Sequence, residues 1–192
     1  VLLSLLFAAH WTEGYADMIQ KGIGGKVVRF HVLANSDSEA DQALKLAVRD
    51  RVLQEYGDLL ETCTSKEETL AALKNAQQEI SETAEAEVLA QGYTYPVRVS
   101  LVREEFPFKK YGDLIFPAGV YDALRIEIGE AKGKNWWCVL YPQMCYVDAA
   151  WGYSTEESHV RLQNTLTKEE FLVVSAMEQK KVTPKIKCRL VE

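Results

Sequence analysis

The sequence has few cysteines, and their spacing excludes the common zinc-binding arrangements. The four cysteines lie at positions 63, 138, 145 and 188, and no two of them form a C-x-x-C pair. A phosphate-binding loop is missing as well. The segment from Gly129 to Lys134 has one residue too few between its glycines, and Asn135 follows where serine or threonine would contact magnesium. No paired-carboxylate or nucleophile-elbow pattern is present, so we expect no metal and no cofactor.

The chain also lacks an excess of positive charge. Its 22 Lys and Arg residues are outnumbered by 28 Asp and Glu residues, which gives a net charge of −6. No basic stripe with interleaved aromatic residues overrides this balance, which argues against nucleic-acid binding. Repeats and low-complexity segments are absent too, and 192 residues are enough for one domain with a self-sufficient hydrophobic core.

A long hydrophobic run is absent from the N-terminus. Residues 1–9, VLLSLLFAA, are too few to span a bilayer, but they resemble the end of a signal peptide, and residues 14–16 form an acceptable cleavage site. Because the sequence does not begin with methionine, we interpret residues 1–16 as a truncated signal peptide or membrane anchor. The alternative is a short buried helix. Residues 17–26 are glycine-rich near their end and are expected to form a flexible linker.

The most distinctive segment is the aromatic run at residues 133–145. If it is a strand, its side chains alternate between two faces, and both faces are apolar. We therefore expect either a central strand covered on both sides or an exposed aromatic patch, with one indole in the core and the other partly exposed. The first face carries Trp136, Cys138 and Leu140, and the second carries Trp137, Val139 and Tyr141.

Cys138 and Cys145 are predicted to form a disulfide if the protein is exported. Seven steps of extended chain would separate their Cα atoms by about 23 Å, whereas a disulfide requires about 5.5 Å. The chain must therefore turn back between them, and Pro142 favours such a turn. The competing interpretation is two buried free thiols. Cys63 and Cys188 are expected to be unpaired.

Apolar periodicity predicts a single α+β domain over residues 27–150. Strands are expected at residues 27–34, 93–106, 120–128 and near 136–141. Two long helices are expected to pack on one face of a mainly antiparallel sheet, one ending near residue 61 and one running from a Ser65–Glu68 capping box to Gly92.

Residues 151–192 are expected to form a C-terminal extension. We predict a loop at residues 151–164, then a short helix that starts at a Thr167–Glu170 capping box and reaches about residue 180. Residues 184–191 are interpreted as a last strand or a tail.

Polar side chains are expected to share the sheet face that the two long helices leave open. They would surround whichever tryptophan points to that face, which makes a candidate partner-binding surface. The alternative is the ordinary polar face of a half-exposed antiparallel sheet. The candidate residues are Arg29, His31, Arg98, Arg125, Asn135, Trp136 and Trp137, with Ser100 and Glu127 beside them.

Asn35, Ser36 and Asp37 lie at the predicted turn between the first strand and the first long helix. Such residues commonly cap helices. The alternative is an anion site, because the N-terminus of a helix attracts negative charge. Asn35 and Asp37 are therefore added to the candidate site.

From the residues alone, two classes of function stay open besides the partner-binding protein described above. A secreted thiol-dependent or cell-wall hydrolase would need Cys138 or Cys145 beside His31 or His159, with a third group orienting the histidine. The other class is a structural binding module of the cell envelope.

Four motifs, in order, resemble the stage II sporulation protein R family of endospore-forming Firmicutes. They are RFHVLANSDS at residues 29–38, DQALKLxVRD at 41–50, FPAGVYxALRIxIG at 116–129, and NWWCVLYP at 135–142 followed by Cys145. The resemblance covers most of residues 26–148.

This resemblance implies a signalling protein that is made in the forespore and exported into the space between forespore and mother cell. There it would activate a membrane-embedded aspartic protease, stage II sporulation protein GA, which matures the pro-sigma-E transcription factor. The family implies no catalytic residues. We therefore expect a binding protein and not an enzyme, with membrane contact through the N-terminal segment.

Overall fold

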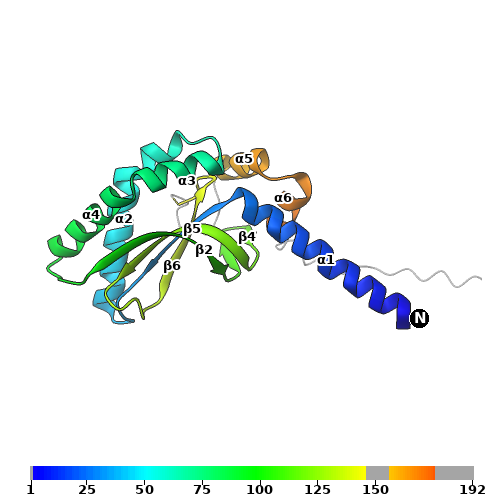
Figure 1. Ribbon diagram of the computed structural model, residues 1–192, viewed down its shortest axis with the longest axis horizontal. Helices are drawn as coiled ribbons and strands as arrows, with labels where there is room; N and C mark the ends of the chain where they lie inside the picture. The colour runs from blue at the N-terminus through cyan, green and yellow to red at the C-terminus, as the bar shows by residue number, and fades with distance from the viewer. Residues whose placement is uncertain (1, 146–155, 176–192) are drawn as a thin grey trace, which may run out of the picture.

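The computed structural model describes residues 2–145 and 156–175, and its centre is a four-stranded sheet (Figure 1). β1 is parallel to β5, while the β2–β5 and β1–β6 pairs are antiparallel. This confirms the predicted α+β class with a mainly antiparallel sheet. β6, for which a central strand was one of two alternatives, lies at an edge. The strands are β1 (Val28–Leu33), β2 (Val97–Phe106), β5 (Gly119–Ile128) and β6 (Asn135–Tyr141), in the order β2-β5-β1-β6.

Three helices cover one face of the sheet (Figure 1): α2 (Glu39–Glu61), α3 (Lys66–Asn75) and α4 (Gln77–Ala90). α3 and α4 replace the single helix predicted to follow Ser65, because the helix is interrupted at Ala76. Gly92, with φ of 84°, follows α4. The first core lies between these helices and the sheet and includes Val28, Phe30, Val32, Leu44, Val48, Ile80 and Ala84.

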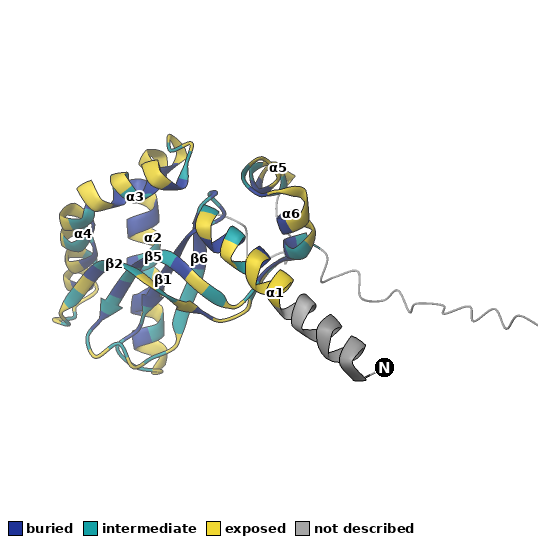
Figure 2. Cartoon of the chain, turned by 45° about the vertical axis from the view of Figure 1, so that its right-hand side comes forward, coloured by how far each residue is buried: buried dark blue, intermediate teal, exposed yellow. Residues whose placement is uncertain are grey.

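The opposite face is covered as well. Its cover consists of α1 (Leu2–Lys26), α6 (Lys168–Ser175) and a hairpin of β3 (Lys109–Tyr111) and β4 (Leu114–Phe116). The expectation of an open polar face is therefore wrong for much of this side, and Figure 2 shows buried residues in the strands between the two layers. The second core includes Ile23, Val27, Phe116, Tyr121, Val139 and Val174.

Residues 17–26 are helical and do not form a linker. Ile19 and Ile23, one turn apart, are 8% and 0% exposed in the second core. Lys26 at the end of the helix forms an ion pair with buried Glu170 of α6, with 2.6 Å between Nζ and Oε2. Burial of this apolar stripe outweighs the low helix propensity of the three glycines.

The C-terminal part contains two short helices. α5 (Glu156–Thr165) replaces part of the predicted loop, since its Leu162 is buried in the second core. α6 begins at the predicted capping box: the N–H of Thr167 donates to Glu170 Oε2 at 2.7 Å, and the N–H of Glu170 donates to Thr167 Oγ1 at 3.2 Å. The predicted strand or tail at 184–191 and Cys188 lie outside the described residues. Among the helices of the described part, none is both long and apolar enough to cross a membrane.

Candidate functional site

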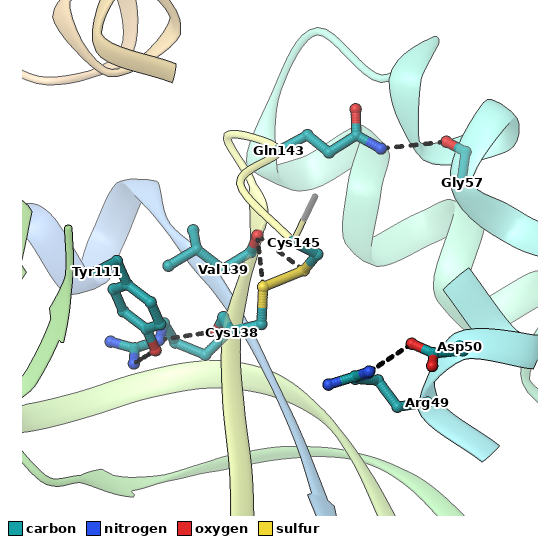
Figure 3. The surroundings of a disulfide bond; sticks show 9 residues. Arg49, Asp50, Gly57, Tyr111, Cys138, Val139, Gln143 and Cys145 are labelled. Atoms are coloured by element: carbon teal, nitrogen blue, oxygen red, sulfur yellow. Dashed lines mark hydrogen bonds and ion pairs between the residues drawn. A yellow bond between two sulfur atoms is a disulfide. The ribbon is translucent and has the colours of Figure 1, made fainter. Parts of the chain in front are cut away.

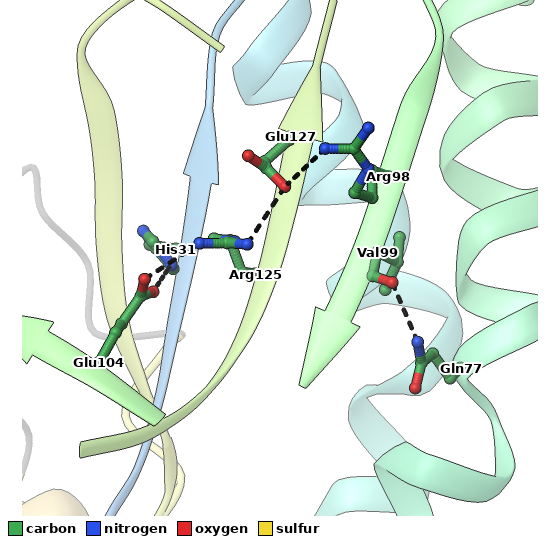
Figure 4. Close-up of polar contacts among 7 residues, drawn as sticks. All are labelled: His31, Gln77, Arg98, Val99, Glu104, Arg125 and Glu127. Carbon is green, nitrogen blue, oxygen red and sulfur yellow. Dashed lines mark hydrogen bonds and ion pairs between the residues drawn. The ribbon is translucent and has the colours of Figure 1, made fainter. Parts of the chain in front are cut away.

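A strip of alternating charges crosses the sheet on its second face (Figure 4). We define the charged strip as Arg98, Glu127, Arg125, Glu104 and His31. Successive N–O distances along it are 3.8, 3.4, 3.1 and 2.6 Å. Side-chain exposure falls from 78% at Arg98 to 4% at His31, so the strip runs from solvent into the second core.

The strand register brings the strip to one tryptophan. Ser100 of β2 is opposite Arg125 of β5, which is opposite His31 of β1, which in turn is opposite Trp137 of β6. Residues in register on neighbouring strands point to the same face. Arg98, Arg125 and His31 therefore lie on the same face of the sheet as one tryptophan, as predicted.

Neither indole is fully buried, although one was expected to be core. Trp137 stacks on His31, with ring centroids 5.0 Å apart and planes 14° apart. Trp136, on the other face, meets Phe30 edge-on at 5.6 Å and lies under Arg49, whose Cζ is 4.8 Å from the ring centroid. Each indole therefore combines packing against the domain with exposed area.

Arg29 is the main correction to the predicted site, because it is 0% exposed. Its Nε donates to the Cys138 carbonyl at 3.1 Å and its Nη2 donates to the Tyr111 hydroxyl at 2.8 Å. No carboxylate pairs with this guanidinium among the described residues. Four rings enclose it instead, with centroids 4.8 to 5.7 Å from Cζ: Phe106, Tyr121, Phe116 and Tyr111. Arg29 therefore fastens the β3–β4 hairpin to the sheet and does not face a partner.

His31 is buried in a neutral form at pH 7. The pKa of His31 is lowered from 6.5 to about 4, chiefly because burial disfavours the charged imidazole; Arg125 and Arg29 also lower it, and the Glu104 carboxylate opposes the shift. An imidazole that stays neutral can stack on Trp137 without bringing a charge into the core. Its role in the site is thus to support Trp137 from beneath.

We expect this histidine to make the domain less stable in mild acid. Between pH 6.5 and about 4 the unfolded chain binds a proton on His31 that the folded chain does not. The contribution of His31 to the free energy of unfolding is therefore fully present above pH 6.5. It is lost as the pH drops through this window, by about 1.4 kcal/mol per pH unit and about 3 kcal/mol in total. Urea unfolding at a series of pH values measures this, and His31→Gln should flatten the profile. Parallel profiles for the two proteins would contradict it.

Asn35 and Asp37 hold two turns together. Asn35 Oδ1 accepts the N–H of Glu130 at 3.0 Å, and Asp37 Oδ1 accepts the N–H of Lys134 at 2.7 Å. A Cβ at Gly129, where φ is +61°, would collide with Asn35. Their oxygens are thus engaged by the 129–134 turn, which feeds β6, and this arrangement does not favour an anion site. The cap of α2 is Ser38, whose Oγ accepts the N–H of Asp41 at 3.1 Å.

Cys138 and Cys145 form a disulfide in the structure, with Cα atoms 5.5 Å apart (Figure 3). The chain turns at the cis Tyr141–Pro142 peptide, and the N–H of Met144 donates to the Val139 carbonyl at 3.1 Å. Neither sulfur is then a free thiol. The hydrolase hypothesis thereby loses the nucleophile that it named.

We expect mass spectrometry of the protein, isolated and alkylated without reductant, to find Cys138 and Cys145 unlabelled. Replacing both by alanine should lower the free energy of unfolding by about 2.5 kcal/mol, the chain-entropy estimate for a loop of this length. Label on both residues would refute the disulfide. A crosslink between Cys63 and Cys188 would refute the expectation that these two are unpaired; in the structure Cys63 is free.

Tyr141, at the end of β6, lies on the opposite face of the strand from the one predicted. The register shifts between Val28 and Arg29, so Tyr141 turns to the helix side and its hydroxyl donates to the Thr64 carbonyl at 2.6 Å. A hollow of about 260 Å³ lies beside it and is lined by Cys63, Gln143 and Arg161, among others. In the described part of the chain, no three His, Cys, Asp or Glu side chains lie close enough to hold a metal.

Three residues of the site were missed from the sequence. Glu104 has the same strand parity as Arg98 and Ser100, so alternation alone would have placed it on their face. Lys109, whose Nζ lies 4.9 Å from the Trp137 ring centroid, and Arg49 come from the hairpin and from α2. No sequence pattern connects these two residues to the tryptophans.

Comparison with known proteins agrees with the motifs. The sequence is 36% identical over 135 residues to stage II sporulation protein R of Bacillus subtilis (strain 168), which covers 70% of this chain and 60% of that protein. The chain thus spans less than two thirds of this relative. No solved structure matches this chain.

The family model described as stage II sporulation protein R matches residues 24–151. This match is more than half of the chain and includes all four strands, the charged strip, both indoles and the disulfide. The second core extends beyond the matched residues, because Ile19, Ile23, Leu162 and Val174 also belong to it. This chain belongs to the stage II sporulation protein R family, which has a role in sporulation.

Proposed function

We propose that the protein is a sporulation signal exported from the forespore, and that it activates the membrane-embedded aspartic protease stage II sporulation protein GA. The protease in turn processes pro-sigma-E in the mother cell. The observation that carries this proposal is membership of the stage II sporulation protein R family across the folded core. Export into the intermembrane space, with membrane contact through residues 1–16, is part of the same proposal.

We place the contact with the protease at the exposed end of the charged strip and at the two indoles. Arg98 is mostly exposed, and Arg125, Trp136 and Trp137 each keep part of their surface in solvent. Arginine and tryptophan contribute disproportionately to binding at protein interfaces. This combination of chemistry and exposure supports a protein-binding surface.

The remaining candidate residues act from behind this surface. Arg29 and His31 are buried and position the hairpin and Trp137. Asn35 and Asp37 hold the turn that leads into Asn135, the first residue of β6. We therefore treat these four as positioning residues.

Reconstitution tests the proposal directly. The purified, folded chain is added to membranes that contain the protease, and cleavage of the sigma precursor is measured. Stimulation is expected, and its absence with a folded chain would sink the proposal. Arg98→Glu should reduce stimulation at least fivefold, while Arg51→Glu, a matched reversal of an exposed charge on α2, should leave it unchanged. If both variants reduce it equally, the strip is not the contact.

A further inference from the structure

The two edges of the sheet are protected to different degrees. At the β2 edge, Gln77 Nε2 donates to the Val99 carbonyl at 3.0 Å (Figure 4). The strand also carries Arg103 and Glu105 near its end. Capped main-chain groups and charges are the usual protection of an edge strand against addition of another strand. The β6 edge has no charged residue between Asn135 and Tyr141. Among the described residues, it is the less protected of the two edges.

The described chain covers only one end of the β6 edge. The Val139 carbonyl accepts the N–H of Met144, so it points away from β1. Because main-chain groups alternate in direction along an antiparallel pair, the N–H and C=O groups of Trp137 and Asn135 point outward as well. Within residues 2–145 and 156–175, no hydrogen bond reaches these outward groups.

Cations flank this open stretch on both faces. Arg49 lies over Trp136 on one face, and Lys109 lies over Trp137 on the other. Arg49 contacts exposed Asp50 at 2.6 Å, but a surface ion pair of this kind is weak and another carboxylate can replace it. Lys109 has no ion pair among the described residues. Both faces beside the edge therefore favour acidic side chains, although the chain as a whole is acidic.

We propose that Asn135–Trp137 is a docking edge for an extended acidic segment of the partner protein, which adds to the sheet as a strand beside β6. Main-chain hydrogen bonds would supply affinity, and side chains would pack alternately on the two indoles. Neighbouring residues of a strand face opposite sides. Two adjacent acidic residues therefore supply one carboxylate to Arg49 and one to Lys109. The identity of the partner rests on the proposed function, while the surface is testable without it.

A short peptide tests the docking edge on the full chain. The probe is Thr-Val-Glu-Glu-Val-Thr, compared with the same peptide carrying Lys-Lys, and binding is followed by tryptophan fluorescence. The glutamate peptide should bind at least tenfold more tightly. Asn135→Pro removes one outward N–H at the first strand position, where proline is tolerated, and should weaken binding at least tenfold. Asn135→Ala, which keeps that N–H, is the matched comparison and should bind clearly more tightly than Asn135→Pro.

Several results would overturn the docking edge. They are equal affinity for the two peptides, no binding of the glutamate peptide at millimolar concentration, and equal binding by folded Asn135→Pro and Asn135→Ala. If Asn135→Pro does not fold, the double reversal Lys109→Glu with Arg49→Glu decides, because the preference must then switch to the lysine peptide. A concentration-dependent dimer that excludes the peptide would assign the edge to a second copy and also overturn it. Peptide binding as expected, with no stimulation of the protease, would sink the proposed function alone.

Discussion

Replacing Arg29 by alanine is expected to lower the free energy of unfolding by at least about 3 kcal/mol. The change leaves the Cys138 carbonyl and the Tyr111 hydroxyl without their donor and opens a cavity among four aromatic rings. Urea unfolding followed by tryptophan fluorescence measures the loss. Arg29→Ala should also loosen the packing of Trp137, because Phe106 contacts both Arg29 and that indole.

A second variant separates the charge of Arg29 from its volume. Arg29→Met keeps most of the side-chain volume and removes a buried charge that has no carboxylate partner, which relieves a desolvation cost. We therefore expect Arg29→Met to lose less than half of what Arg29→Ala loses. Arg98→Ala, at the exposed end of the strip, should change stability by no more than about 0.5 kcal/mol. Similar losses for all three variants would contradict the role assigned to Arg29.

Removing residues through Lys26 is expected to destabilise the domain strongly, whereas removing residues through Glu13 should not. The longer truncation takes away Ile19 and Ile23, and burial of two such side chains contributes about 3–6 kcal/mol. It also leaves Glu170 buried without Lys26, and an unpaired buried carboxylate is costly. The second core would then be open to solvent beside β5.

Thermal unfolding and resistance to trypsin compare the two truncated chains. A chain that starts at Val27 and unfolds like the full chain would show that α1 is dispensable for the fold. The expected result also bears on export: cleavage after Ala16 would retain Ile19 and Ile23, so the exported form would keep both cores. Residues 17–26 would then be part of the folded domain.

Much of the fold follows from local patterns. Alternation along the strands correctly separated Val28, Phe30 and Val32 from Arg29 and His31, because a strand sends successive side chains to opposite faces. The Thr167–Glu170 capping box and the turn at Pro142 were also predicted, since each depends on residues only a few positions apart.

The errors have a common physical origin. Arg29 was predicted to be exposed because its face of the strand is polar, yet the hairpin, α1 and α6 cover that face. Residues 17–26 were read as a linker because of their glycines, yet contact with the sheet makes them helical. A central strand was one of two alternatives for β6, because both of its faces are apolar, yet β6 lies at an edge with a packed layer on each face.

The sequence by itself determined the family, the fold class, the four strands of the central sheet and the side chains that share a face, because alternation, capping and motif spacing are properties of neighbouring residues. The β3–β4 hairpin was not predicted. Only the tertiary structure decided which faces are covered and which edge is open. Those features arise where segments distant in sequence meet: Arg29 with Tyr111 across 82 positions and Lys26 with Glu170 across 144. The local preferences of neighbouring residues do not predict such contacts. The burial of Arg29, the pKa of His31 and the exposure of the β6 edge among the described residues therefore depend on tertiary packing.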